Sequence, residues 1–341
     1  MKVVIIIEKF MSAICKYAIK NTFFKLLVFL LLPILSLGAI AANSDPKIEI
    51  INYSKVPTST LEKWTKAGTA RLSDWQADTL GVIWELGRIV SDGRTDVFPF
   101  NKHKVILSVS DLKTLAGDLE TWITSSKCNE DPYRAEENKW GYKDIVHWIE
   151  GGADVATAPD PCYDRRMVLM GRTPDQDEKT VQQIWLHELY HAHSNYLTNY
   201  CVNPNDSERD RDKIFDKHDS QRWFGEGTAE YFAFMVKADM NGVSDPVSAM
   251  LKDAHSKIQR EGTDLFSNIA GNSAVALRLL MERGNIPSLE KDVISGAVFH
   301  DCSWPDKWNR DTSREIDFAL ENWFRIENKG GKWGFSNEAL N

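Results

Sequence analysis

One five-residue string in this chain combines the side chains that a catalytic metal site needs. It reads His187-Glu188-Leu189-Tyr190-His191. On a helix, His187 and His191 lie one turn apart, so both imidazoles can bind a single ion. Glu188 is about 100° further round the helix and can reach a water molecule on that ion. Random placement would give this pattern roughly once in a hundred such chains, so further residues must support it.

A second acidic motif can supply the third protein ligand that a catalytic zinc site requires. Glu226 and Glu230 lie four residues apart, so on a helix their carboxylates face the same side. Glu226 can complete the metal shell, and Glu230 can accept the free ring N–H of a ligating histidine. The alternative is that both are ordinary helix residues, one solvent-facing and one interacting with the helix dipole. The presence of both motifs favours the metal site.

Two other groups of residues compete for the role of ligand. His193 follows His191 by two residues, about 200° round the helix, so we expect it to pack in the core. An acidic stretch could provide the third ligand in place of Glu226, or form a solvated loop or a loose calcium site. Its spacing fits no standard calcium-binding loop. This stretch contains Asp206, Asp210, Asp212 and Asp216.

The five-residue string followed by Glu226-Gly227-Thr228-Ala229-Glu230 resembles the motifs of the gluzincin group of zinc metallopeptidases, to which thermolysin belongs. In that group a glutamate on a second helix binds zinc, and an acidic residue follows one turn later. The resemblance covers residues 180–240. It implies that Glu226 is the third zinc ligand and that Glu230 accepts a hydrogen bond from a zinc-bound histidine.

The resemblance also implies a peptidase that carries one Zn²⁺ per chain and acts on a peptide or protein substrate. Glu188 would take a proton from the attacking water and pass it to the leaving amine, while zinc polarises the scissile carbonyl. Members of the group usually add a tyrosine or histidine that stabilises the oxyanion, and Tyr231 and His300 are the candidates here. The other large class of zinc peptidases requires Gly and His where Ser194 and Leu197 stand, which excludes it.

Two other functions fit the same side chains. The first is a binding or scaffolding protein that keeps a zincin-like fold but has lost catalysis. The intact Glu188 argues against it, because loss of the base is the simplest route to inactivity. The second is a zinc hydrolase that acts on a cell-wall cross-link or an ester, for which the metal and the base would be the same.

The elements that must position these residues are expected to form an α+β fold. Helical spacing of apolar residues predicts a helix over 59–90, and β-branched runs predict strands over 104–109 and 166–170. Between the strands we expect a helix over 112–124 and a loop region over 126–164, which is rich in Asp, Pro, Gly and Cys.

The second half of the chain is predicted to be mainly helical. The string should lie on a helix over 177–197, and the acidic motif on one over 224–238. Further helices are predicted over 246–260, 264–283, 288–296 and 313–326. The resemblance implies a zincin-like metallopeptidase fold, with an N-terminal α+β subdomain (42–175), a helical subdomain (176–341) and the active site between them. The strand Met167–Met170 could then pair with an extended peptide.

The first 41 residues are predicted to be a signal peptide. Five lysines precede an apolar run from Leu26 to Ile40, and the run ends in the small-x-small sequence Ala39-Ile40-Ala41. An uncleaved membrane anchor is the alternative, but the run falls short of the roughly 20 apolar residues that span a bilayer. We therefore expect an exported protein of the periplasm, the extracellular space or the secretory lumen, without stable membrane insertion.

Charge and cysteine content fit an exported, acidic protein. The chain has a net charge of −8, and without residues 1–41, which hold five lysines and one glutamate, the charge is −12. Such a surface repels phosphate backbones, so nucleic acid is not an expected partner. Cys128, Cys162, Cys201 and Cys302 predict two disulfides. Of three possible pairings, Cys128–Cys162 with Cys201–Cys302 is preferred, because it closes each half of the chain separately.

Overall fold

The computed structural model describes most of the chain from Lys47 onward, and residues 46–341 form one compact unit. Among the described residues, no helix is both long and apolar enough to cross a lipid bilayer. The predicted signal peptide and three of the four cysteines that are predicted to pair lie outside the described residues. Cys302 is disulfide-bonded, and its pairing stays a prediction. The described residues are 47–73, 75, 77–89, 103–125, 142–158, 165–200, 218–284, 286 and 288–341.

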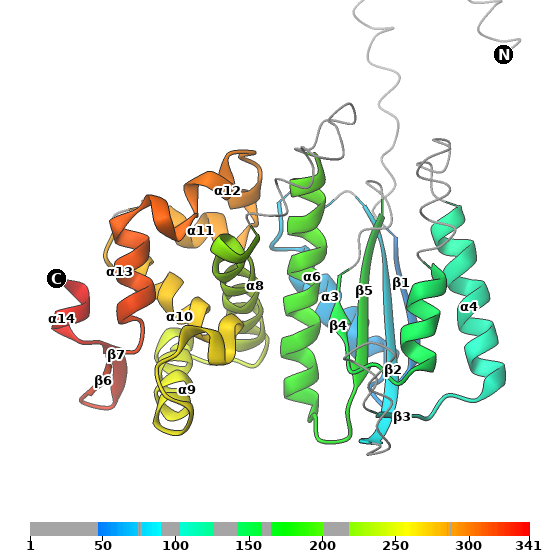
Figure 1. Ribbon diagram of the computed structural model, residues 1–341. Coiled ribbons are helices and arrows are strands. Elements are labelled where there is room, and N and C mark those ends of the chain that lie inside the picture. The colour runs from blue at the N-terminus through cyan, green and yellow to red at the C-terminus, as the bar shows by residue number, and fades with distance from the viewer. Residues whose placement is uncertain are drawn as a thin grey trace, which may run out of the picture. The chain divides into compact units, whose positions relative to one another are not determined.

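Five strands of the described residues form one mixed sheet (Figure 1). Strands β1 (Ile48–Tyr53), β2 (Asp78–Ile89) and β5 (Arg165–Arg172) run parallel to one another. Strand β4 (Ala156–Thr157) pairs antiparallel with β5, and β3 (His103–Val105) pairs antiparallel with β2. The order β1-β2-β5-β4 makes β4 the edge strand beside β5.

The long strand β2 corrects the predicted helix over 59–90. Helix α3 (Thr58–Thr69) forms only the first part of that range, and the second part is extended. A strand buried on both faces shows a nearly continuous apolar run, which by itself resembles a buried helix. Gly81 marks the difference, because a Cβ atom there would lie 2.5 Å from the ring of Trp185. The missing side chain lets a helix pack directly on the strand.

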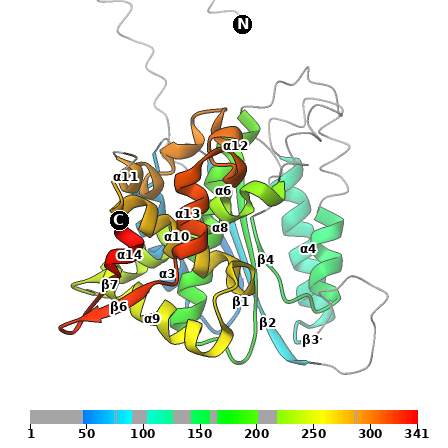
Figure 2. The ribbon, with the colours of Figure 1, turned by 60° about the vertical axis from the view of Figure 1, so that its left-hand side comes forward.

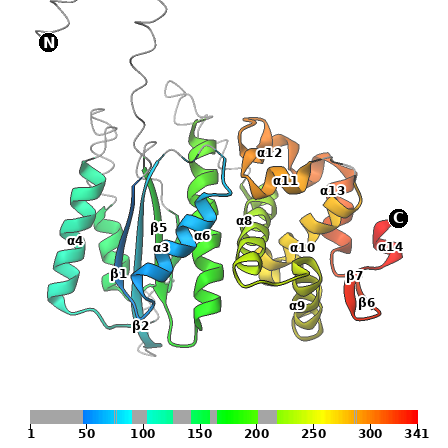
Figure 3. The ribbon, with the colours of Figure 1, turned by 180° about the vertical axis from the view of Figure 1, so that it is seen from behind.

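Helices cover both faces of the sheet (Figures 1 and 3). On one face, α3 and α6 (Glu178–Tyr200) join β2 and β5 in the larger core. On the other face, α4 (Val109–Thr124) and a helical segment over 142–150 enclose a second core. This helical segment corrects the loop expected there. Ile145 and Ile149, one turn apart, supply its buried stripe.

Three other predicted elements of this half are confirmed with altered boundaries. The strands expected over 104–109 and 166–170 are β3, which is shorter, and β5, which is longer. The helix expected over 112–124 starts earlier, at Val109, because Ser108 forms a reciprocal capping box in front of it.

The C-terminal half of the described residues is mainly helical, as predicted. Helix α8 (His218–Met240) contacts α6, and α10 (Ile269–Glu282) packs against both α8 and α13 (Arg314–Asn322) (Figure 2). The helix expected over 313–326 is shorter, because a hairpin follows it. The hairpin turn, Gly330-Gly331, has positive φ at both residues, as tight hairpin turns require. The remaining elements are α9 (Pro246–Glu261), η2 (Leu265–Asn268), α11 (Leu289–Ile294), η3 (Ala297–Phe299), α12 (Trp304–Lys307), η4 (Arg310–Thr312), β6 (Ile326–Lys329), β7 (Lys332–Phe335) and α14 (Asn337–Leu340).

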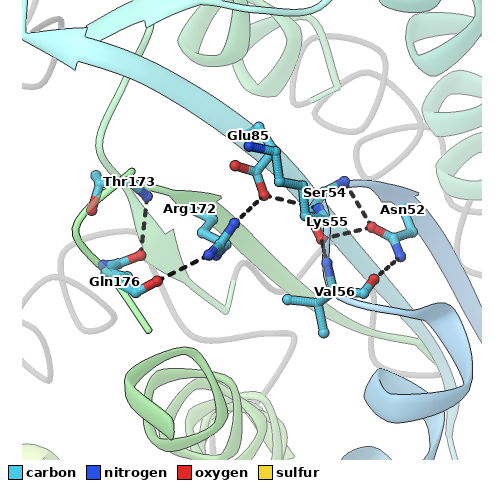
Figure 4. Close-up of polar contacts among 8 residues, drawn as sticks. All are labelled: Asn52, Ser54, Lys55, Val56, Glu85, Arg172, Thr173 and Gln176. Carbon is cyan, nitrogen blue, oxygen red and sulfur yellow. Dashed lines mark hydrogen bonds and ion pairs between the residues drawn. The ribbon is translucent and has the colours of Figure 1, made fainter. Parts of the chain in front are cut away.

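A polar cluster lies where strands β1 and β5 end (Figure 4). The buried Glu85 on β2 accepts hydrogen bonds from the backbone N–H of Lys55 at 2.9 Å and from the guanidinium of Arg172 at 2.6 Å. Arg172 also donates to the backbone carbonyl of Gln176 at 3.1 Å. Because α6 begins two residues after Gln176, the cluster fixes the start of this helix against the sheet.

Candidate metal centre

Two neighbouring helices, α6 and α8, carry the predicted metal ligands (Figure 1). Both are longer than expected, since α6 continues to Tyr200 and α8 begins at His218. Gly227, within the acidic motif, faces helix α10. A Cβ atom on Gly227 would lie 2.9 Å from the backbone of Ser273 on α10. This glycine therefore allows α10 to pack closely on α8 and hold it in position.

The nitrogen and oxygen atoms of the ligand group converge on one point. Nε2 of His187 and Nε2 of His191 are 3.0 Å apart. Oε2 of Glu226 lies 3.3 Å from the first nitrogen and 3.7 Å from the second. Donor atoms on a tetrahedral ion with bonds of about 2.1 Å would lie about 3.4 Å from one another. These three side chains could therefore hold a metal ion.

Glu230 lies behind one of the two histidines. Its Oε2 is 3.0 Å from Nδ1 of His187, so the carboxylate accepts the ring N–H and turns Nε2 toward the other ligand atoms. The side chain of Gln183 on α6 donates to the backbone carbonyl of Glu230 at 3.4 Å. These contacts fix the orientation of the His187 ring between the two helices.

The charges around the ligand group favour a cation. Burial alone would lower the pKa of His187, but hydrogen bonds to Glu226 and Glu230 outweigh burial and raise it to about 10. Burial opposes ionisation of Glu226 as well, yet hydrogen bonds from His187 and His191 hold its pKa well below its usual range. The two carboxylates thus favour a positive charge at His187.

The ligand group opens onto a cleft of about 430 Å³, and Glu188 is among the residues that line it. Only 8% of Glu188 is exposed. Burial raises the pKa of its carboxyl, and the positive charges of His191 and His187 offset part of that effect. A carboxylate that is not part of the ligand group thus lies in the same cleft as the ligands.

The edge strand β4 forms one wall of this cleft through Ala156 and Thr157. The strand expected to bind an extended peptide, Met167–Met170, belongs to β5. Because β4 pairs with β5 at Leu169 and Met170, β5 is covered there, and the edge beside the cleft belongs to β4. The sequence interpretation missed β4 because it falls in the region expected to be a loop.

The two candidates for oxyanion stabilisation, Tyr231 and His300, are not among the described residues that line the cleft. The hydroxyl of Tyr231 donates to Glu290 at 2.7 Å and accepts from Arg278 at 3.2 Å. Nε2 of His300 lies 3.2 Å from the hydroxyl of Ser73. In this structure both side chains bind partners away from the ligand group.

His193 is a buried histidine outside the ligand group. It is 1% exposed and stacks on the ring of Trp75, with 5.6 Å between the ring centroids. Burial lowers its pKa to about 3, and the nearby Arg166 and His300 contribute to the shift. The packing of His193 agrees with the prediction from its angle on the helix. The acidic stretch considered as an alternative ligand source lies outside the described residues.

Several residues that line the cleft were not singled out from the sequence. Asn195 and Thr198 continue from His191 along α6, and Gln221 and Arg222 precede the ligand on α8. Helical periodicity could have found the first pair, because residues three or four positions apart share a face with His191. Gln221 and Arg222 fall between the helices predicted over 177–197 and 224–238, so helical periodicity was not applied to them.

No protein-family model, curated protein or solved structure matches this chain. The chain is therefore described by its own geometry, which is a mixed sheet with helices on both faces beside a helical half. The basis for a functional assignment is the group of two histidines and one glutamate at the cleft.

Proposed function

We propose that this chain is a zinc-dependent metallopeptidase with a zincin-like fold of the gluzincin type. One observation carries the proposal. Two imidazole nitrogens and one carboxylate oxygen converge within 4.8 Å of one another, and a further carboxylate, Glu188, lies in the cleft onto which they open. A three-ligand site with a separate carboxylate has the composition of a catalytic metal centre rather than a structural one.

The donor set favours zinc over the hard cations. Calcium takes six to eight oxygen ligands and magnesium prefers oxygen donors, whereas two histidines and one glutamate are a known ligand set of catalytic zinc. Glu230 adds a carboxylate at Nδ1 of His187, one of the partners that typically accept the second ring N–H of a zinc-bound histidine. When bound, the ion supplies Lewis acidity, which activates water and polarises a carbonyl group.

Glu188 is the side chain best suited to move the proton. Glu226 and Glu230 both contact His187, whereas Glu188 has no hydrogen-bond partner among the described residues and lines the cleft. It can accept a proton from the attacking water and donate it to the leaving amine. Removal of this carboxylate should leave the metal ligands intact and stop hydrolysis.

The shape of the cleft supports a peptide as the substrate. Its volume of about 430 Å³ falls in the range of ligand-binding pockets. The edge of β4 lies along one wall, where an extended peptide can add main-chain hydrogen bonds. An ester or a cell-wall cross-link would use the same metal and base but would gain less from a strand edge.

Hydrolysis of an unbiased peptide library by zinc-loaded protein tests the proposal. We expect the wild type to cleave peptides and Glu188→Gln to bind the same amount of zinc with activity lower by roughly 10²- to 10⁴-fold. Glu261→Gln, on an exposed glutamate of α9, is the matched control and should match wild type. Equal activity of wild type and Glu188→Gln, or cleavage of esters without cleavage of peptides, would overturn the assignment.

A further inference from the structure

The cleft continues beyond the ligand group, and the polar side chains on its two helices differ in how they are bonded. On α6, the hydroxyl of Ser194 donates to the carbonyl of His191 at 3.2 Å. The amide of Asn195 donates to the carbonyl of Ala158 at 3.0 Å and ties α6 to the end of β4. These α6 residues therefore use their polar groups within the protein. Gln221 and Arg222, which precede the ligand Glu226 on α8, have no side-chain hydrogen bond among the described residues.

Gln221 on α8 is a buried donor without a partner. Only 4% of the residue is exposed and it lines the cleft, yet its amide nitrogen has no hydrogen-bond partner. Trp304 lines the same cleft, and its indole nitrogen is also buried without a partner. Buried N–H groups are nearly always paired in folded proteins. Two unpaired donors at one cleft suggest that a ligand supplies the acceptor.

Arg222, next to Gln221, brings a positive charge to this part of the cleft. It is the one lysine or arginine among the described residues that line the cleft, and it has no carboxylate partner among the described residues. It lies close to the N-terminus of α8, where the helix dipole disfavours a cation. Within the part of the chain that the structure describes, neither an ion pair nor the dipole therefore accounts for an arginine at this position.

We propose that Arg222 and Gln221 bind a carboxylate of the substrate close to the scissile bond, which makes this a peptidase selective for acidic peptides. The inference rests on the proposed function and names its substrate class. Guanidinium groups bind carboxylates through paired, charge-assisted hydrogen bonds, and the amide of Gln221 adds a further donor.

The position of Arg222 limits where the carboxylate can be. Arg222 precedes Glu226 by four residues on α8, a rise of about 6 Å along the helix. Two residues of an extended peptide cover a similar length, about 6.6 Å. Arg222 therefore lies near the ligand group, and we expect the carboxylate on a residue close to the scissile bond. The carboxylate can be an aspartate or glutamate side chain or the C-terminal carboxylate of the peptide.

Matched peptides test the preference and separate the two sources of the carboxylate. One pair differs by aspartate against asparagine at a single position, and the other by a free C-terminus against an amide. We expect the wild type to show a kcat/KM roughly 10- to 100-fold higher for the acid of one pair, the size of a charge-assisted interaction. The pair that shows the preference identifies the source.

The exposed Arg222 can be changed with little risk to the fold. Arg222→Ala should lower kcat/KM for acidic peptides to the level of neutral ones and so abolish the preference. Arg222→Glu should reverse the preference. Arg260→Ala, at an exposed arginine of α9 outside the cleft, should retain it. A wild type without a preference, or a preference that survives Arg222→Ala, would overturn the inference.

Binding to the Glu188→Gln variant separates this inference from the proposed function. Tryptophan fluorescence can follow the same peptides as they bind, without hydrolysis. We expect the acidic peptides to bind roughly 10-fold or more tightly than the neutral ones, and Arg222→Ala in the same background to abolish the difference. That result with an inactive wild type would refute the peptidase and retain the carboxylate site. Hydrolysis without any Arg222-dependent preference would refute the carboxylate site alone.

Discussion

Replacing Glu230 by glutamine tests how strongly the carboxylate behind His187 supports metal binding. Burial opposes its charge, but the hydrogen bond from His187 at 3.0 Å outweighs burial and lowers the pKa of Glu230. The side chain is therefore ionised at neutral pH, and glutamine removes a charge while it keeps the size and an acceptor oxygen. Loss of such a partner typically costs 10- to 100-fold in metal affinity, which is about 1.4 to 2.8 kcal/mol.

The assay is a competition titration of zinc between the protein and a chromophoric chelator at fixed pH. For Glu230→Gln we expect the Kd of zinc to rise by roughly 10- to 100-fold. Tyr231→Phe is the matched control on the next residue, because its hydroxyl bonds to Glu290 and Arg278 rather than to a ligand. Its zinc affinity should equal that of the wild type, and circular dichroism checks that each variant is folded.

Two outcomes would refute this reasoning. A folded Glu230→Gln protein that binds zinc as tightly as the wild type would mean that the contact to Nδ1 does not orient His187 for the metal. An equal loss of affinity in Tyr231→Phe would mean that the effect comes from a general disturbance of α8. Only a loss confined to Glu230→Gln supports the assigned role.

Three further predictions concern stability. Gly227→Ala should destabilise the fold by about 1 to 3 kcal/mol in urea unfolding, because the new Cβ would meet the backbone of α10 at 2.9 Å. The control Gly225→Ala, on the same helix but facing open space, should be neutral or stabilising by up to about 1 kcal/mol. Equal effects of the two substitutions would contradict the packing argument. Glu85→Ala leaves the largely buried guanidinium of Arg172 without its carboxylate partner and should cost about 3 kcal/mol by the same measurement. A cost near zero would show that the cluster does not hold the start of α6. Zinc at 100 times its Kd should stabilise the wild type by about 2.7 kcal/mol, measured as a higher Tm that a chelator reverses. If zinc raised the Tm of Glu226→Ala by the same amount, Glu226 would be excluded as a ligand.

The candidate site was predictable from the sequence where its geometry is local. His187 and His191 share a helix, so their four-residue spacing alone determines that both rings face the same way. Glu226 lies on a second helix, and Gly227 and Glu230, which follow it in the sequence, identified it as a ligand. A glycine is required at position 227 because α10 packs closely against it, so this packing contact is visible in the sequence.

The remaining features depend on contacts that no local pattern encodes. The apolar run over 78–89 is compatible with a helix or a doubly buried strand, and only its pairing with β1 and β5 decides between them. Strand β4 has two residues, too few for any periodic signal. The cleft wall joins Arg222 on α8 with Trp304 on α12, which are 82 positions apart in the sequence.

Anomalous X-ray diffraction at the zinc absorption edge tests the central claim most directly. Crystals of the protein purified with zinc should give one strong peak per chain, about 2.0 to 2.2 Å from Nε2 of His187, Nε2 of His191 and an oxygen of Glu226. Glu188 should lie near the peak without contacting it. A peak at other residues, a fourth protein ligand in place of the open position, or no peak at these three side chains would contradict the proposed catalytic zinc centre.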